Sequence, residues 1–207
     1  MWPNAEETQV LLIQAEGGDD EAVNRLLDKH RDSLRQMIQF RMDRQLARRL
    51  DASDIVQDVL LEANRRLANY LNNPTLPFHL WLRQLAKDRV IDMHRRHRVA
   101  RKRSVDREQP LAESPHADRS SLELAGMLAD PELTPAAATI RRELQARFFQ
   151  ALDELDDDDR EILLMRHQEQ LSNSEVALAL GVSQPAAGMR YLRALRRLRE
   201  ILGNPSS

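Results

Sequence analysis

The sequence has no cysteine and few glycines or aromatic residues. Without cysteine there are no disulfides and no thiolate metal sites, which fits a reducing compartment. Only 4% of the residues are aromatic and six are glycine. Runs of β-branched residues are scarce, which argues against an extensive sheet. Leu, Ala, Arg, Glu and Asp dominate instead, and this composition favours helices. We therefore expect an all-α protein.

Long apolar runs and several catalytic signatures are also missing. No 18-residue apolar run occurs, and the N-terminal residues lack the regions of a signal peptide, so we expect a cytoplasmic protein without membrane contact. The P-loop, G-x-S-x-G and H-E-x-x-H motifs are absent. His94 and His97 lie three residues apart among arginines and have no further ligand nearby. We expect no metal, no other cofactor and no enzymatic activity.

A net charge of -2 hides two strongly charged segments. Residues 87–103, KDRVIDMHRRHRVARKR, carry eight Lys and Arg against two Asp. Such a segment predicts a polyanionic partner, above all nucleic acid. Residues 153–161, DELDDDDRE, are almost entirely acidic. We interpret them as a solvated helix start, at the opposite end of their module from its arginines.

Hydrophobic periodicity predicts two groups of helices. The first group comprises residues 6–16, one long helix over 20–47, a helix starting at the N-cap Asp51, and a helix over 78–103. The second comprises residues 136–152, 157–168, 172–180 and a last helix from 183. Residues 104–135 are rich in Pro, Ser and acids. We therefore predict a helical domain at 1–103, a flexible linker at 104–135 and a second helical domain at 136–207.

The stretch LSNSEVALALGVSQPAAGMRYLRALRRLRE, residues 171–200, predicts two helices around Gly181. Ser172 and Glu175 match a capping box, and Gly181 supplies the positive φ that a helix-turn-helix needs. Five arginines against one glutamate in the second helix favour phosphate binding. The alternative is a helical hairpin in a bundle whose arginines form a solvated face.

Two further segments precede this stretch in order. They are DASDIVQDVLLEA at 51–63 and PFHLWLRQLAKDRVIDMHRRHRVARKR at 77–103. The ordered trio resembles bacterial RNA polymerase sigma factors of the sigma-70 family, specifically the small two-domain extracytoplasmic-function type, or group 4. In that family the corresponding patterns are DxxDLVQEVFLxA, FxxWLxxIARNxxIDxxRRxRR and LSxxEIAxxLGISxGTVKSRLxRAxxRLR. The resemblance covers about 150 residues and implies a region 2 helical bundle linked to a region 4 helix-turn-helix.

The resemblance also implies partners and binding residues. The partners would be core RNA polymerase, through its largest-subunit clamp helices and its flap, promoter DNA, and an anti-sigma factor. The polymerase-binding residues on the helix at 51–67 would be Asp54, Ile55, Gln57, Asp58 and Leu61. The residues that bind and melt the −10 element would be Asn69, Tyr70, Asn72, Phe78, Lys87, Arg89, Arg95, Arg96 and Arg98. The residues that recognise the −35 element would be Ser183, Gln184, Ala186, Ala187, Met189, Arg190, Arg193 and Arg197.

Some of these residues have a purely structural alternative. Ile55 fits the helix core equally well, and Asp54 fits a helix start. Tyr70 and Phe78 are candidates for stacking on an unpaired base. Trp81 is expected in the core, because Leu82 and Leu85 follow it at helical spacing.

The sequence departs from the family pattern at two places. Asp88 stands where the family usually has Asn. In the second helix of the C-terminal stretch, residues 185–188 are Pro-Ala-Ala-Gly where the family has Gly-Thr-Val-Lys. This helix therefore lacks the threonine hydroxyl and the lysine cation of the family pattern. Alanine can contact a thymine methyl group but makes no bidentate hydrogen bond to a base.

Two other classes of protein compete with the sigma factor. A helix-turn-helix regulator would bind duplex operator DNA without polymerase, but it leaves the basic helix at 78–103 unexplained. An adaptor would bind another protein without recognising DNA, and it would tolerate charge reversal at Arg190 and Arg193.

Overall fold

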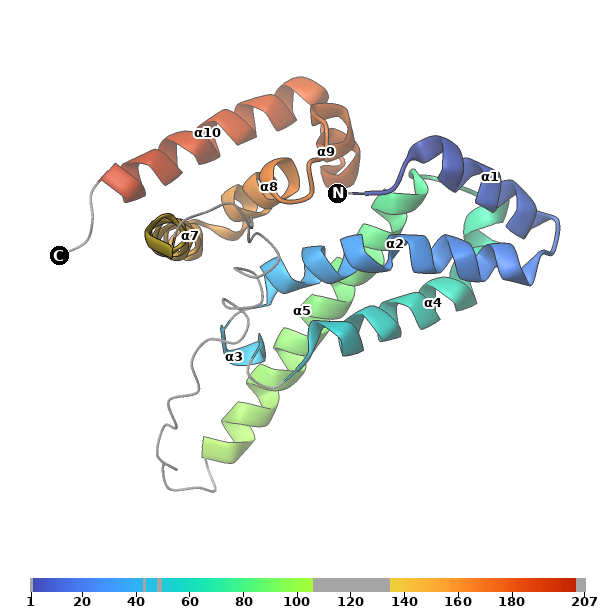
Figure 1. Cartoon of the computed structure of the whole chain (residues 1–207), viewed down its shortest axis with the longest axis horizontal. Coiled ribbons are helices and arrows are strands. Elements are labelled where there is room, and N and C mark those ends of the chain that lie inside the picture. Colours follow the sequence, from blue (N-terminus) through green and yellow to red (C-terminus); the bar gives the residue numbers. More distant parts are fainter. Residues whose placement is uncertain (1, 43, 48–49, 106–134, 204–207) are drawn as a thin grey trace. The chain divides into compact units, whose positions relative to one another are not determined.

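The computed structural model describes residues 2–42, 44–47, 50–105 and 135–203 (Figure 1). All regular elements among these residues are helices, which confirms the all-α prediction. The helices fall into two compact units, α1–α5 and α7–α10. Most of the predicted linker lies outside the described residues. Within the described ranges, no helix combines the length and the low polarity needed to cross a membrane.

Helices α1 (Ala5–Glu16) and α2 (Asp20–Arg41) form an antiparallel pair at the start of the first unit. Asn4 and Asp19 cap their N-termini through side-chain oxygens. The prediction of one helix over 20–47 is wrong. Met42 takes an extended backbone (φ -74°, ψ 122°) and ends α2, and its side chain packs against the core. A short helix, α3 (Arg44–Ala47), follows.

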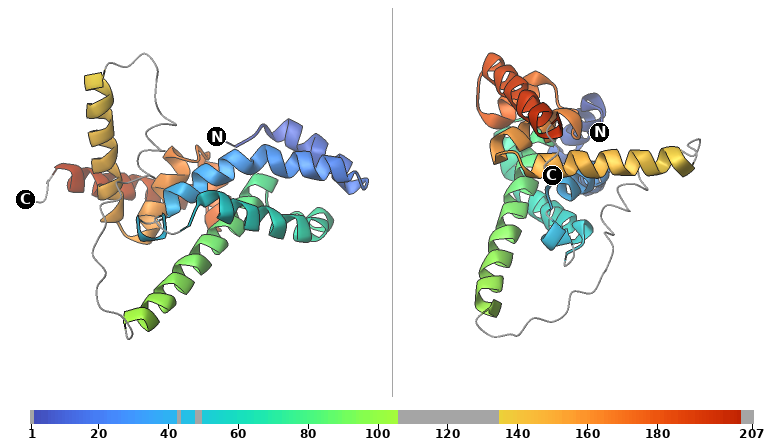
Figure 2. Two further views of the ribbon diagram at one scale, coloured as in Figure 1. Left: turned by 60° about the horizontal axis from the view of Figure 1, so that its bottom comes forward. Right: turned by 90° about the vertical axis from the view of Figure 1, so that its left-hand side faces the viewer.

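Helices α4 (Ala52–Asn72) and α5 (Phe78–Val105) complete the unit. The Asp51 carboxylate accepts a hydrogen bond from the Ser53 amide at 2.7 Å, which confirms Asp51 as the N-cap. The core lies between α2, α4 and the first half of α5. The basic end of α5 projects beyond the other helices of the unit (Figure 2).

A buried histidine joins α1 to α2. His30 is 1% exposed, and its Nε2 lies 3.4 Å from the Thr8 hydroxyl on α1. The Thr8 hydroxyl proton is donated to the Asn4 carbonyl at 2.8 Å, so we assign the ring proton of His30 to Nε2. Nδ1 is then a buried acceptor without a partner among the described residues. Burial, with contributions from His79 and Lys29, lowers the pKa of His30 to about 4.

The second unit consists of α7 (Pro135–Asp153), α8 (Asp157–His167), α9 (Asn173–Leu180) and α10 (Gln184–Gly203). Pro135 begins its helix, where its missing N–H costs nothing. The buried residues that join these helices include Leu152, Ile162, Leu163, Met165, Val176, Ala177, Ala194 and Leu198. The unit therefore has a small apolar core of its own.

Candidate functional site

The outward face of α4 is the first candidate surface. Asp54 and Gln57 are exposed, and Leu61 is 51% exposed although it is apolar. Ile55 is 1% exposed and belongs to the core, so its assignment to polymerase binding is corrected. The reason is the helical repeat: position 55 lies on the same side as buried Val59, whereas 54, 57 and 61 lie on the other side.

A groove with a volume of about 550 Å³ runs beside this face, between α2 and α4. It is lined by Asn24, Arg25, Leu27, Asp28, Arg31, Gln57, Leu60, Leu61 and Asn64. The α2 residues were not predicted from the sequence. The sequence pattern that could have identified them is the recurrence of polar residues at positions 24, 28 and 31. These positions lie about one helical turn apart, on the side of α2 that faces away from its core residues.

Two residues assigned to different partners form an ion pair with each other. The Arg89 guanidinium on α5 donates a hydrogen bond to the Asp58 carboxylate on α4. Both side chains are partly exposed. Asp58 and Arg89 therefore link α4 to α5. A partner that binds either residue must break this ion pair or contact both side chains while they remain paired.

The aromatic residues near the loop at 73–77 are largely buried. Tyr70 and Phe78 are 8% and 3% exposed, so their assignment as base-stacking residues is corrected. The Tyr70 hydroxyl donates to the Leu76 carbonyl at 2.9 Å, and its ring packs on Trp81 with 4.7 Å between centroids. Burial raises the pKa of Tyr70.

Trp81 keeps a partly exposed ring at the edge of the same cluster. The expectation that it lies in the core is correct only in part. Asn69 and Asn72 are exposed close by in the chain, at the end of α4. The surface near the loop thus offers amide groups and one partly exposed aromatic side chain to a ligand.

Basic side chains continue along α5. Arg95 and Arg96 are exposed, and Arg95 contacts Asp92 at 3.1 Å. Lys87 is half-buried and Asp88 is exposed. The side chain of Arg98 lies outside the described residues. Among the residues that the structure describes, no cluster of His, Asp or Glu could hold a metal ion.

The turn between α9 and α10 has the predicted geometry. Ser172 and Glu175 form a complete capping box, and Gly181 has a φ of 64°. The Ser183 hydroxyl accepts a hydrogen bond from the Ala186 amide at 3.3 Å, and the Gln184 carbonyl accepts one from the Asn173 side chain at 2.9 Å. The predicted helix-turn-helix is therefore present in the second unit.

Ala187 is fully buried, so its assignment to −35 DNA is corrected. It packs in the core of the unit because it lies on the same side of α10 as Ala194. Gln184, Met189 and Arg190 are exposed, and Ala186 is half-buried. These four residues remain available to a ligand.

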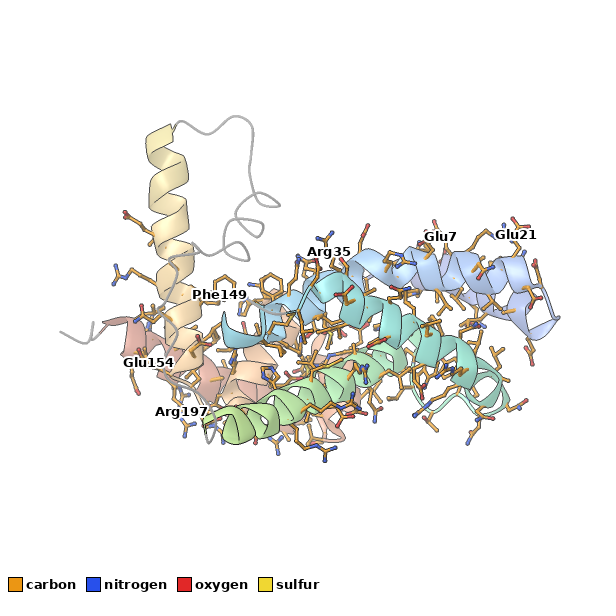
Figure 3. The ribbon with its side chains drawn as sticks, turned by 90° about the horizontal axis from the view of Figure 1, so that it is seen from below. Glu7, Glu21, Arg35, Phe149, Glu154 and Arg197 are labelled. Atoms are coloured by element: carbon orange, nitrogen blue, oxygen red, sulfur yellow. The ribbon has the colours of Figure 1, made fainter. Side chains whose placement is uncertain are left out.

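The acidic segment does not lie apart from the arginines of α10, which corrects the prediction made for it. Asp159 is fully buried and accepts hydrogen bonds from Arg193 at 2.9 Å and from Arg197 at 2.5 Å. Asp156 also pairs with Arg197 (labelled in Figure 3). A hydrogen bond from the Asp159 amide, assisted by Arg197, lowers the pKa of Asp156. Arg193 and Arg197 therefore link α10 to the start of α8, although both stay about half exposed.

Two family profiles match the chain in order. "Sigma-70 region 2" matches residues 26–99, which include all of α4 and most of α5. "Sigma-70, region 4" matches residues 145–198, which include all of α8 and α9 and most of α10. The first match lies in the first unit, and the second lies in the second unit except for residues 168–170.

Two curated relatives carry similar sequences. The probable RNA polymerase sigma factor RfaY of Xanthomonas campestris pv. campestris is 32% identical over 151 residues, 73% of this chain. This chain spans only 34% of RfaY. The RNA polymerase sigma factor CnrH of Cupriavidus metallidurans is 28% identical over 195 residues, which cover 94% of this chain and 93% of CnrH.

Solved structures share the fold. CnrH, in complex with the cytosolic domain of CnrY, matches with a TM-score of 0.62 and 24% identity, over 98% of this chain and 100% of that chain. The sigma factor RpoE of Bartonella quintana, in complex with the anti-sigma factor NepR, matches with a TM-score of 0.56 and 19% identity, over 88% of this chain and 98% of that chain.

Proposed function

The chain belongs to the extracytoplasmic-function group of the sigma-70 family, and on that premise we propose that it directs core RNA polymerase to specific promoters. The first unit would bind the polymerase and the −10 element, and the second unit would bind the −35 element. The chain itself would carry no catalytic activity. The observation that carries this proposal is the pair of family matches on separate units, the second of which contains a capped helix-turn-helix.

We propose that the polymerase docks on the outward face of α4 and on the adjoining groove. Asp54 supplies a carboxylate, Leu61 supplies an exposed apolar side chain, and Gln57 lies between them on the same side. An exposed apolar side chain with polar side chains around it matches the anatomy of a protein interface, in which a polar rim surrounds an apolar centre. The α2 residues that line the groove would form the other half of the surface.

The −10 element would bind the surface formed by the end of α4, Trp81 and the exposed arginines of α5. Unstacking a base costs a few kcal/mol, and a partly exposed aromatic side chain with nearby amides can offset that cost. Because Tyr70 and Phe78 are buried, Trp81 takes the role first assigned to them. Arg95 and Arg96 would contact phosphates.

An anti-sigma factor is a further proposed partner. RpoE, which shares the fold, forms a complex with the anti-sigma factor NepR. We propose that such a partner covers the polymerase-docking face of α4, because occlusion of that face would keep the protein from polymerase.

The proposal is tested by capture of purified bacterial core RNA polymerase on the immobilised full-length chain. Stoichiometric capture by the wild type is expected, with a large loss for the double variant Asp54→Arg/Leu61→Glu. Asp58 is left unchanged because its pair with Arg89 links α4 to α5.

Glu6→Arg serves as the matched control. Glu6 and Asp54 are both exposed acids in the first turn of a helix, so either charge reversal removes a similar interaction with the helix dipole. The control should capture polymerase as well as the wild type. Absence of capture by the wild type, combined with tight binding of the chain alone to duplex DNA, would instead establish an independent regulator.

A further inference from the structure

The side of α10 that faces away from the core of the second unit is apolar over its first half. At 3.6 residues per turn, position 189 lies about 200° around the helix from position 187. Ala187 is fully buried, whereas Met189 is 64% exposed and Leu192 is 47% exposed. Pro185 is exposed one turn before Met189. We name Pro185, Met189 and Leu192 the apolar strip.

The apolar strip lies among cations. Arg190 and Arg196 are exposed beside it, and neither makes an ion pair within the described part of the chain. Arg193, also beside it, is held by buried Asp159 but stays about half exposed. A surface with clustered cations around an apolar centre is suited to bind a polyanion that presents apolar groups in a groove. Duplex DNA has this chemistry, because phosphates flank a major groove in which thymine presents a C5-methyl group.

Hydrogen-bonding side chains are scarce at the same end of α10. The Ser183 hydroxyl accepts a hydrogen bond from the Ala186 amide and keeps one proton to donate. The side chain of Gln184 is exposed and can reach a base edge. In a helix-turn-helix the N-terminal residues of the second helix contact base edges, and here Pro185 and Met189 supply apolar groups at that end beside Gln184 and Arg190.

We infer that the apolar strip recognises thymine methyl groups of the −35 element, with Met189 as the specificity-determining residue. The inference rests on the proposed function, because it assumes that α10 enters the major groove of promoter DNA. Met189 lies at the centre of the strip, and its unbranched side chain can reach a methyl group from several rotamers.

The test begins with holoenzyme reconstituted from core polymerase and the full-length chain. The holoenzyme selects from duplexes that carry a randomised −35 region upstream of a fixed −10 region. Each thymine of the selected −35 sequence is then replaced, one at a time, by deoxyuridine, which lacks only the C5-methyl group. Affinity for each duplex is measured with the wild type, with Met189→Ala and with Leu202→Ala. Leu202 is an exposed apolar residue near the other end of α10 and serves as the matched control.

For the wild type and for Leu202→Ala, deoxyuridine at one or more positions should weaken binding about fourfold, the value of one buried methyl group. For Met189→Ala the same replacement should change affinity by less than about twofold, because the contact is already lost. This non-additivity is the sign of direct contact.

Other outcomes would overturn the inference or its premise. A selected −35 sequence without thymine, or one insensitive to deoxyuridine, would overturn methyl recognition and leave the proposed function standing. If Met189→Ala weakened capture of core polymerase and left the deoxyuridine effect intact, the apolar strip would be a protein-docking surface. Absence of any selected −35 sequence would contradict the proposed function itself.

Discussion

Acid should destabilise the first unit through His30. The pKa of this buried imidazole is about 4, against 6.5 for an unperturbed histidine. Protonation would place a charge and a second N–H in a site where Nδ1 has no partner among the described residues. The unfolded chain has no such penalty, so it binds the proton more readily.

The sign and the magnitude of the effect follow from proton linkage. Between pH 6.5 and pH 4 the unfolded state binds more protons than the folded state, so the free energy of unfolding falls as the pH falls. The shift of His30 from 6.5 to about 4 corresponds to about 3 kcal/mol, lost across that window and no further below it. Above pH 6.5 this group contributes no pH dependence.

The assay is urea unfolding followed by tryptophan fluorescence at several pH values. The two tryptophans, Trp2 and Trp81, both belong to the first unit, and the Trp2 ring lies 6.0 Å from the His30 ring. The control variant is His30→Leu. It leaves the Thr8 hydroxyl bonded to the Asn4 carbonyl and should remove most of the dependence between pH 6.5 and 4. If the variant loses as much stability as the wild type over this window, the assignment to His30 is refuted.

Two further predictions concern stability. Gly188→Ala should raise the free energy of unfolding of the second unit by up to about 1 kcal/mol, because glycine is a poor helix former and the new Cβ would meet only Asn173 Oδ1, at 3.8 Å; a lower urea midpoint by circular dichroism would contradict this. Tyr70→Phe should lower the stability of the first unit by about 1 kcal/mol, because the Leu76 carbonyl loses its donor. An unchanged fluorescence midpoint would show that this hydrogen bond contributes nothing.

The helices were largely predictable because their signals are local. Asp51 and Ser172 cap helices from adjacent positions in the chain, and the left-handed conformation of Gly181 follows from its place at the C-terminal end of α9, directly before the turn into α10. The end of α2 at Arg41 was not predicted, because residues after Met42 continue a pattern that is compatible with a helix. There the packing of Met42 on the core outweighs local preference.

The functional surfaces were less predictable because they depend on contacts between distant residues. Arg193 and Asp159 are 34 residues apart, and nothing in either segment alone indicates that the acid is buried beneath the arginine. Ile55 and Ala187 fit a family pattern for binding, but the pattern does not state which side of the helix meets the core. Tyr70 and Phe78 lie next to a polar loop, yet they pack on each other with 5.5 Å between ring centroids.

The central claim is that the chain gives core RNA polymerase its choice of promoter. The most direct measurement is in vitro transcription on a library of bacterial genomic fragments with core polymerase alone and with core polymerase plus the full-length chain, followed by mapping of RNA 5′ ends. The account predicts a discrete set of start sites that appears only with the chain, shares −10 and −35 sequences, and is lost for Asp54→Arg/Leu61→Glu. Identical 5′ ends with and without the chain, while the chain alone binds duplex DNA tightly, would contradict it.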